Sequence, residues 1–330
     1  MFAFTVRRLL SAIPILLVST FAVFLLIASS VDPLSAMKSR NPPIPKSTIA
    51  TEAHRLFLDR PLVDRYWHWL SGLVLHGNFG LSTQPGLNIN QALGPRFFVT
   101  LRLVIAAVLL SMILAVLVGV LSAVRQYSRM DYAATLVGFL FLSLPVFWFA
   151  ILLKNWAVKF NDAVGAHPFQ TLFSQSARSV GAHQSFVAHM GDLASHLILP
   201  TVVLSTATYA AWARFQRASM LDVLNSDYMR LARAKGLSKT RVMVKHGLRT
   251  ALIPLTTQMA LDVAALLVGV VITERIFQWQ GLGTFFLDAV NTGDANALMG
   301  FLIITSMLII IFNLIADLLY AVLDPRIRLA

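Results

Sequence analysis

No charged residue interrupts the stretch LLSAIPILLVSTFAVFLLIASSV, which runs from Leu9 to Val31. A bilayer core about 30 Å thick needs about 20 apolar residues in helical form, so this stretch is long enough to span it. A signal-peptide core holds only about 7–15 apolar residues. We therefore expect a retained membrane-spanning helix near the start of the chain.

Further apolar runs follow along the chain. They lie between Arg102 and Arg125, between Asp131 and Lys154, from Leu193 to Ala213, from about Ile253 to Thr273, and from about Ala297 to Leu323. The Leu193–Ala213 run is the least apolar, and we expect its His196 and Pro200 to mark the outer end of a helix rather than a metal site. The sequence thus predicts an all-α integral membrane protein with six transmembrane helices.

The composition agrees with a membrane protein. Hydrophobic residues make up 57% of the 330 residues and charged residues 13%, whereas soluble domains carry about 25% charged residues. The net charge of +12 is spread between the apolar runs instead of forming one patch, so we expect no nucleic-acid partner. The absence of cysteine excludes disulfides and thiolate metal sites.

Lysine and arginine predict the orientation of the helices, because short cytoplasmic loops are rich in them. Such residues precede the first span, lie between the second and third, and close the chain: Arg7, Arg8, Arg125, Arg129, Arg326 and Arg328. The segment from Arg214 to Arg249 holds nine Lys or Arg. We expect these segments and both termini to be cytoplasmic. The long segment from Asp32 to about Phe98 is then extracytoplasmic.

The extracytoplasmic segment shows a helical pattern from Thr51 to Leu75. Its apolar residues recur at spacings of three, four and seven: Leu56, Val63, Trp67, Leu70 and Val74. The following His76–Gly80 stretch predicts a turn. We expect a small packed cap over the first helix, the alternative being a docking surface for an extracytoplasmic partner.

The connection between the fourth and fifth spans predicts two short helices outside the membrane. Asn225, Ser226 or Asp227 can cap the first helix, which ends at Gly236. Ser238 can cap a second helix from Lys239 to about Ala251, before Pro254 opens the fifth span. Small Ala232 and Ala234 would allow close approach by another surface. A basic amphipathic hairpin resting on anionic lipid is the alternative.

This connection resembles the cytoplasmic coupling motif of ABC-importer permeases, whose general form is Glu-Ala-Ala, three residues, then Gly. It is most similar to the dipeptide/oligopeptide permease variant, around Asp-Tyr-Ile-Arg-Thr-Ala-Arg-Ala-Lys-Gly-Leu-Ser. The matching residues are Asp227, Tyr228, Arg230, Ala232, Arg233, Ala234, Lys235, Gly236, Leu237 and Ser238, and Met229 and Leu231 differ from the usual pattern.

The resemblance extends over nearly the whole chain. Elements similar to those of the family are Arg7-Arg8-Leu9-Leu10, His76-Gly77-Asn78-Phe79-Gly80-Leu81-Ser82, Ser143-Leu144-Pro145-Val146-Phe147-Trp148, Arg249-Thr250-Ala251-Leu252-Ile253-Pro254, Trp279-Gln280-Gly281-Leu282-Gly283 and Asp324-Pro325-Arg326-Ile327-Arg328. Departures from the pattern include Ser29-Ser30-Val31-Asp32-Pro33, Asn78 and Gln280. These lie on the outer face, so they bear on substrate and binding protein rather than on energy coupling.

The resemblance implies a type I ABC importer permease in a bacterial or archaeal cytoplasmic membrane. Residues 1–98 would form the first span and the extracytoplasmic segment, and residues 99–330 a five-helix core with the coupling segment 214–254. Implied partners are a second homologous permease, two cytoplasmic ATPases and an extracytoplasmic peptide-binding protein. This chain has no Gly-x-x-x-x-Gly-Lys-Ser/Thr loop, so ATP and Mg would be bound by the ATPases, and we expect no catalytic, cofactor or metal site here.

Ionisable residues within predicted spans are functional candidates. Asp317 suits an interhelical bond, whereas Asp262, nearer mid-span, is a candidate for the translocation path; a proton relay is also open. Ser143, Pro145 and Trp148 could bend and line the path, although we prefer core packing for them.

Other classes of function remain to be weighed. An ion-coupled secondary transporter would explain the aspartates but not the coupling motif. Related permeases for nickel or other small solutes are a further alternative. An intramembrane enzyme is disfavoured because the chain lacks zinc-protease and nucleophile-elbow motifs.

Overall fold

The computed structural model describes residues 2–30, 32–176 and 185–323, and within these ranges it contains helices, turns and loops but no strand. Val31 and the motif from Asp324 to Arg328 lie outside the described residues. The chain contacts divide into two compact units. The N-terminal unit comprises residues 2–100 and 280–310, and the central unit comprises residues 101–279 together with the chain from residue 311 onward.

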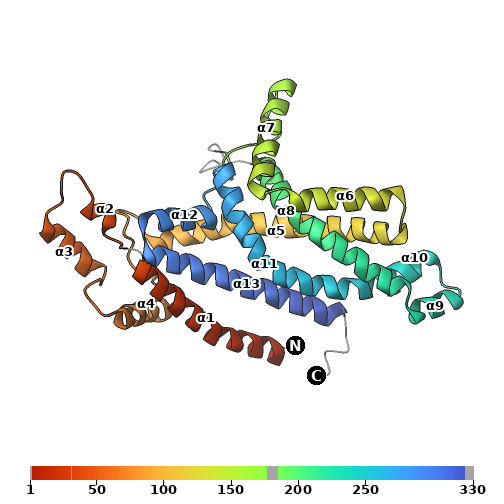
Figure 1. Ribbon diagram of the computed structural model, residues 1–330, viewed down its shortest axis with the longest axis horizontal. Helices are drawn as coiled ribbons and strands as arrows, with labels where there is room; N and C mark the ends of the chain where they lie inside the picture. Colours follow the sequence, from red (N-terminus) through yellow and green to blue (C-terminus); the bar gives the residue numbers. More distant parts are fainter. Residues whose placement is uncertain (1, 31, 177–184, 324–330) are drawn as a thin grey trace. The chain divides into compact units, whose positions relative to one another are not determined.

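The N-terminal unit is built from helices at both ends of the sequence (Figure 1). They are α1 (Phe2–Ser30), α2 (Ser35–Lys38), α3 (Lys46–Arg55), α4 (Leu62–His76), the start of α5 (Ile89–Val124), α12 (Leu282–Thr292) and the start of α13 (Ala295–Leu323). The packing of residues 280–310 with the N-terminal segment was not predicted from the sequence. The predicted division of the chain at residue 98 stays a prediction.

Helix α4 packs on α1 and forms the predicted cap. Tyr66 and Trp69 of α4 are buried in one cluster with Phe24 of α1 and Met299 of α13. The Tyr66 hydroxyl lies 2.9 Å from Thr20 Oγ1, so the cap is also hydrogen-bonded to the first helix. Of the apolar residues in the predicted helical pattern, Val63, Trp67 and Val74 are exposed.

The helix predicted from Thr51 to Leu75 is two helices. Helix α3 ends at Arg55 and α4 begins at Leu62, with Pro61 as its N-cap. Proline disfavours helical geometry in the residue before it, which separates the two segments. Phe57 in the connection has a φ of +57°. The predicted turn after α4 is confirmed, since Gly77 ends this helix in the left-handed region with a φ of +62°.

The central unit holds the remaining helices (Figure 1). They are the rest of α5, α6 (Arg129–Ser143), α7 (Val146–Val164), α8 (Phe186–Leu224), α9 (Asp227–Ala234), α10 (Lys239–Arg241), the π-helix η2 (Val242–Leu248), α11 (Arg249–Phe277) and the end of α13. Helix α8 contacts α6, α7 and α11, so it is the element around which this unit is arranged.

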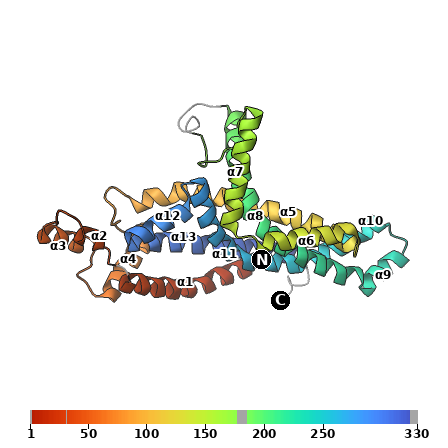
Figure 2. The same ribbon diagram turned by 45° about the horizontal axis from the view of Figure 1, so that its top comes forward.

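The third predicted span is broken. Helices α6 and α7 meet at an angle of 105°, and Figure 2 shows α7 turned sharply away from α6. Leu144, which precedes Pro145, is extended with φ −81° and ψ 125°. A residue before proline avoids the helical region, which explains why the bend lies here. The bend that the sequence left open at Pro145 is present, and the predicted span from Asp131 to Lys154 depends on counting this bent pair as one span.

Helices long and apolar enough to cross a membrane are frequent in the described part of the chain. Five satisfy this on their own: Leu10–Ser30, Ile89–Val124, Phe186–Leu224, Lys239–Phe277 and Ala295–Leu319. The bent pair α6 and α7 makes up to six if it counts as one span. The chain is therefore a multi-pass membrane protein, and the predicted count of six depends on that pair.

His196 and Pro200 lie inside α8 rather than at its end, because this helix begins at Phe186. The expectation that they mark the end of the helix was wrong. The buried His196 ring lies 2.9 Å from the Phe173 carbonyl and 3.2 Å from the Ser176 hydroxyl. This side chain anchors the preceding loop to α8.

Candidate coupling segment

Helix α9 starts and ends where the sequence indicated. Ser226 is its N-cap residue by backbone geometry, but the Ser226 hydroxyl donates to the Val223 carbonyl at 2.6 Å instead of capping the helix. After Ala234 the chain reverses at Gly236, which has a φ of +76°. Ser238 then caps α10, its Oγ accepting a hydrogen bond from the Arg241 N–H at 3.4 Å.

The second helix is not separate from the fifth span. Helix α10, the π-helix η2 and α11 follow one another without a gap from Lys239 to Phe277, and Pro254 lies inside α11. Within this continuous helix, Pro254 removes one i→i−4 backbone hydrogen bond, because proline has no N–H. The expectation of a second short helix ending before Pro254 was wrong. The segment after Gly236 is instead a direct extension of a membrane-spanning helix.

The inner face of α9 packs against this extension. Met229 and Ala232 form a buried cluster with Val242, and Leu237 packs on its edge. Gly247 of η2 leaves room for Met229, since a Cβ added there would lie 3.1 Å from Met229 Cε. Ala232 is only 8% exposed, so the prediction that it receives another surface was wrong. Its small size serves packing within the chain.

The outer face of α9 is exposed and mixed in character. Tyr228 is 43% exposed and Leu231 is 57% exposed. Around them lie the exposed side chains of Asp227, Arg230, Arg233, Ala234 and Lys235. Arg230 Nη1 lies 3.6 Å from Asp227 Oδ1, a pair open to solvent. An apolar centre with a charged surround is a suitable arrangement for contact with another protein.

Gly236→Val should weaken the reversal after α9. A cost of about 1–2 kcal/mol is expected for a residue with a Cβ in the left-handed region, and a β-branched residue is the least suited to it. No atom lies within 4 Å of a Cβ built on Gly236, so backbone strain is the only local cause. We expect faster proteolysis between α9 and α10 in Gly236→Val. Gly236→Asn should behave like the parent chain, because asparagine tolerates this region, and equal proteolysis of both variants would contradict the explanation.

An ion pair between a buried aspartate and a partly exposed arginine ties α6 to α8. Arg217 Nε donates to Asp131 Oδ1, and Arg217 Nη2 donates to Asp131 Oδ2, each at 2.7 Å. The Tyr127 N–H also donates to Asp131 Oδ2 at 2.9 Å, and Asp131 is 3% exposed. In the sequence, Arg217 was interpreted only as one of the basic residues that predict orientation. The spacing of Ser128 and Asp131 resembles a capping box, and this was the feature of the sequence that indicated a structural role for Asp131.

Asp262 is held by two neighbours. Trp212 Nε1 of α8 donates to Asp262 Oδ2 at 2.7 Å, and Gln258 Nε2 donates to Oδ1 at 3.0 Å. Of the roles left open for Asp262, the structure thus supplies an interhelical hydrogen bond. Trp212 is fully buried, so this bond fixes α11 against α8.

The other path candidates lie at the bend between α6 and α7. Ser143, Pro145 and Trp148 are all exposed on the surface of the chain, Trp148 by 47%. The preference for core packing was therefore wrong within this chain. Across the described ranges, no group of three or more His, Cys, Asp or Glu could hold a metal ion.

Comparisons with known proteins agree over most of the sequence. The family model "Binding-protein-dependent transport system inner membrane component" matches residues 115–329, and the model of its N-terminal part matches residues 1–92. The oligopeptide transport system permease protein OppB of Mycobacterium tuberculosis is 38% identical over 98% of both chains. AppB of Bacillus subtilis, named as an oligopeptide permease, is 37% identical over 99% of this chain and 100% of its own. DppB of Escherichia coli K12, named as a dipeptide permease, is 34% identical over 99% of both chains.

Proposed function

Because the chain belongs to the family of binding-protein-dependent transport system inner-membrane components, we propose that it is the permease subunit of an ABC importer for di- or oligopeptides. Relatives at 34–38% identity carry the names of peptide permeases and align over nearly their full length. The chain is a transport subunit and not itself an enzyme. ATP hydrolysis would take place in partner ATPases, and a binding protein would deliver the peptide.

The observation that carries the mechanism is the link from α9 to α11. The inner face of α9 is fixed by Met229 and Ala232 to the extension of a membrane-spanning helix. A force applied to the exposed face of α9 would therefore pass to α11 without crossing a flexible joint. Closure of an ATPase pair against this face would move the span and change access to the path.

The finer assignments belong to the same proposal. The outer face of α9 and the following residues up to Ser238 would contact one ATPase. The chain would span the cytoplasmic membrane with both termini on its inner side. A second homologous permease would complete the path. Asp262 and the bend at Pro145 are proposed as elements of the translocation path because of their place in the spans. For Asp262, the bond from Trp212 also supports a structural role, in which it holds α11 against α8.

Purification of the tagged chain in mild detergent tests the complex as a whole. We expect an ATPase, a second permease and ATP-dependent peptide uptake after reconstitution. Recovery of this chain alone, with uptake driven by an ion gradient and no ATP, would overturn the importer assignment in favour of a secondary transporter.

Leu231→Glu tests the proposed contact face of α9. This substitution places a charge in the apolar centre of the face without disturbing the buried cluster, so we expect the chain to remain folded and the ATPase to be lost on purification. A loss of about 2 kcal/mol or more, the scale of an interface hot spot, would reduce association at least about tenfold.

The matched control is Val290→Glu, the same kind of change at a residue of α12 that is 47% exposed. It should retain the ATPase. If the parent chain co-purifies with the ATPase and Leu231→Glu does so equally well, the outer face of α9 is not the contact surface.

A further inference from the structure

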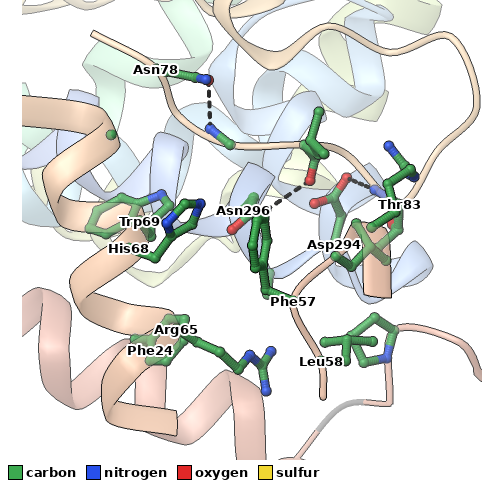
Figure 3. Close-up of a pocket in the computed structure, with 17 residues that line it drawn as sticks. Phe24, Phe57, Leu58, Arg65, His68, Trp69, Asn78, Thr83, Asp294 and Asn296 are labelled. Carbon is green, nitrogen blue, oxygen red and sulfur yellow. Dashed lines mark hydrogen bonds between the residues drawn. The ribbon is translucent and has the colours of Figure 1, made fainter. Parts of the chain in front are cut away.

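The N-terminal unit contains a cavity of about 290 Å³ that the coupling mechanism does not use. Figure 3 shows its wall, which is formed by residues of α1, α4, the α3–α4 connection, the turn after α4 and the start of α13. These segments are far apart in the sequence and belong to one compact unit. The volume is near the lower end of the range for small-molecule sites, about 300–1,000 Å³.

Arg65 is the distinctive group in this wall. Its side chain is half-buried, and burial lowers the pKa of its guanidinium. Within the described ranges Arg65 has no ion pair or side-chain hydrogen bond, and its guanidinium carbon lies 5.7 Å from the Phe24 ring centroid. A partly desolvated cation without a counter-ion is costly, which favours an anion beside it.

The other charged groups of the wall are already satisfied. Arg55 donates to both carboxylate oxygens of Glu52 at 2.5 and 2.8 Å, and also to the Ser82 carbonyl at 2.9 Å. The fully buried Asp294 accepts from the Ser82 hydroxyl and, at 3.0 Å each, from the Thr83 and Ala297 N–H groups. Glu52 therefore neutralises Arg55, and three donors satisfy the Asp294 carboxylate, so Arg65 is the cation of this wall that lacks a polar side-chain partner within the described residues.

Two further polar side chains belong to the wall of this cavity. The Thr83 hydroxyl in the wall is buried and lacks a hydrogen-bond partner within the described residues. The His68 ring packs on Phe57 with the ring centroids 4.2 Å apart. In Figure 3 the Arg65 side chain points into the cavity, whereas the Asp294 carboxylate faces Thr83. The wall thus offers one unused cation, the Arg65 guanidinium.

We propose that this cavity binds an anionic oxygen group, a carboxylate or a phosphate, and that Arg65 recognises it. A guanidinium can donate two parallel hydrogen bonds to either group. The carboxylate could come from the C-terminus of a peptide, and the phosphate from an anionic phospholipid, because α4 packs directly on the membrane-spanning α1. The site does not depend on the assignment of the α9 face.

The test uses the full chain in uncharged detergent with two pairs of probes. Phosphatidylglycerol is compared with phosphatidylcholine by native mass spectrometry, and dialanine with dialanine amide by thermophoresis. We expect at least one anionic probe to bind in preference to its matched partner and to weaken as salt is raised. Arg65→Gln should weaken that probe at least about tenfold, because charge-assisted hydrogen bonds are lost.

Two variants control for charge and for folding. Arg65→Lys keeps the charge and should bind within a few-fold of the parent chain. Arg60→Gln removes an equal charge nearby, from a side chain that packs 5.3 Å from the Phe57 ring and does not line the cavity. It should bind unchanged. Thermal unfolding of each variant confirms that the chain is folded.

The outcomes separate the two sources. Preference for phosphatidylglycerol alone supports a lipid phosphate, preference for dialanine over its amide supports a peptide carboxylate, and both together support a site of mixed use. The proposal is overturned if neither anionic probe is preferred, if Arg65→Gln binds as the parent does, or if Arg60→Gln loses binding equally.

Discussion

Replacement of Arg217 by methionine should cost the folded chain about 3 kcal/mol, the scale measured when one partner of a buried ion pair is removed. The Asp131 carboxylate, 3% exposed in the parent chain, would lose its two bonds from Arg217 and keep the Tyr127 N–H as its donor. An unpaired buried carboxylate is expensive, so we expect a clear drop in the unfolding midpoint of the purified chain in detergent.

The neighbouring Arg214 provides a matched control. Its guanidinium carbon lies 5.7 Å from the Phe139 ring centroid, and an exposed cation–π contact contributes only about 0.5–1 kcal/mol. Arg214→Met should therefore be nearly silent. The double variant Asp131→Asn with Arg217→Met should recover part of the loss, because no charge is left buried. Equal losses for Arg214→Met and Arg217→Met would refute the importance of the pair.

Gly119→Ala should destabilise the chain by about 3 kcal/mol, the upper end of the usual cost of overpacking. Helix α5 approaches α8 so closely here that an added Cβ would lie 2.7 Å from the Ala213 carbonyl oxygen and 2.8 Å from Gln216 Cβ. A backbone oxygen has no rotamer by which to move away, so the two helices must separate. Small residues at helix contacts in membrane proteins permit this kind of close approach.

The same substitution at Gly138 gives the control. Gly138 is in α6, and nothing lies within 4 Å of a Cβ built on it. Alanine is a better helix former than glycine by about 1 kcal/mol, so Gly138→Ala should be neutral or stabilising. Opposite signs for the two variants in thermal unfolding would support the steric explanation, and a stabilising Gly119→Ala would eliminate it.

Much of the fold could be predicted because membrane spans are specified by local composition. The uncharged run after Arg8 is enough to predict α1, whatever its neighbours do. Pro145 indicated that a bend was possible after Ser143, but its angle of 105° could not be predicted, because a hydropathy window averages over Pro145. The association of residues 280–310 with the N-terminal segment depends on contacts distant in sequence, such as Met299 with Phe24, and no local pattern encodes them.

The candidate coupling segment, too, could be predicted only in part from the sequence. Gly236 and Ser238 could be assigned from the sequence, since a left-handed turn and a helix cap have strong residue preferences. The role of Ala232 could not, because a small residue suits either a partner surface or a tight internal contact, and only the position of Met229 and Val242 decides. The pairing of Arg217 with Asp131 could not be predicted either, because several basic residues lie near Arg217 in the sequence and only the fold decides which of them meets Asp131.

The uninterrupted helix from Lys239 to Phe277 also has a mechanical consequence. Its 39 residues reach roughly 58 Å at 1.5 Å per residue, almost twice the hydrocarbon thickness of about 30 Å. Such a rod acts as a lever arm. If it pivots by about 5° at its Phe277 end, its Lys239 end sweeps roughly 5 Å, close to the 5.4 Å pitch of one helical turn. A small change in tilt at the Phe277 end therefore displaces the Lys239 end by about the length of one helical turn.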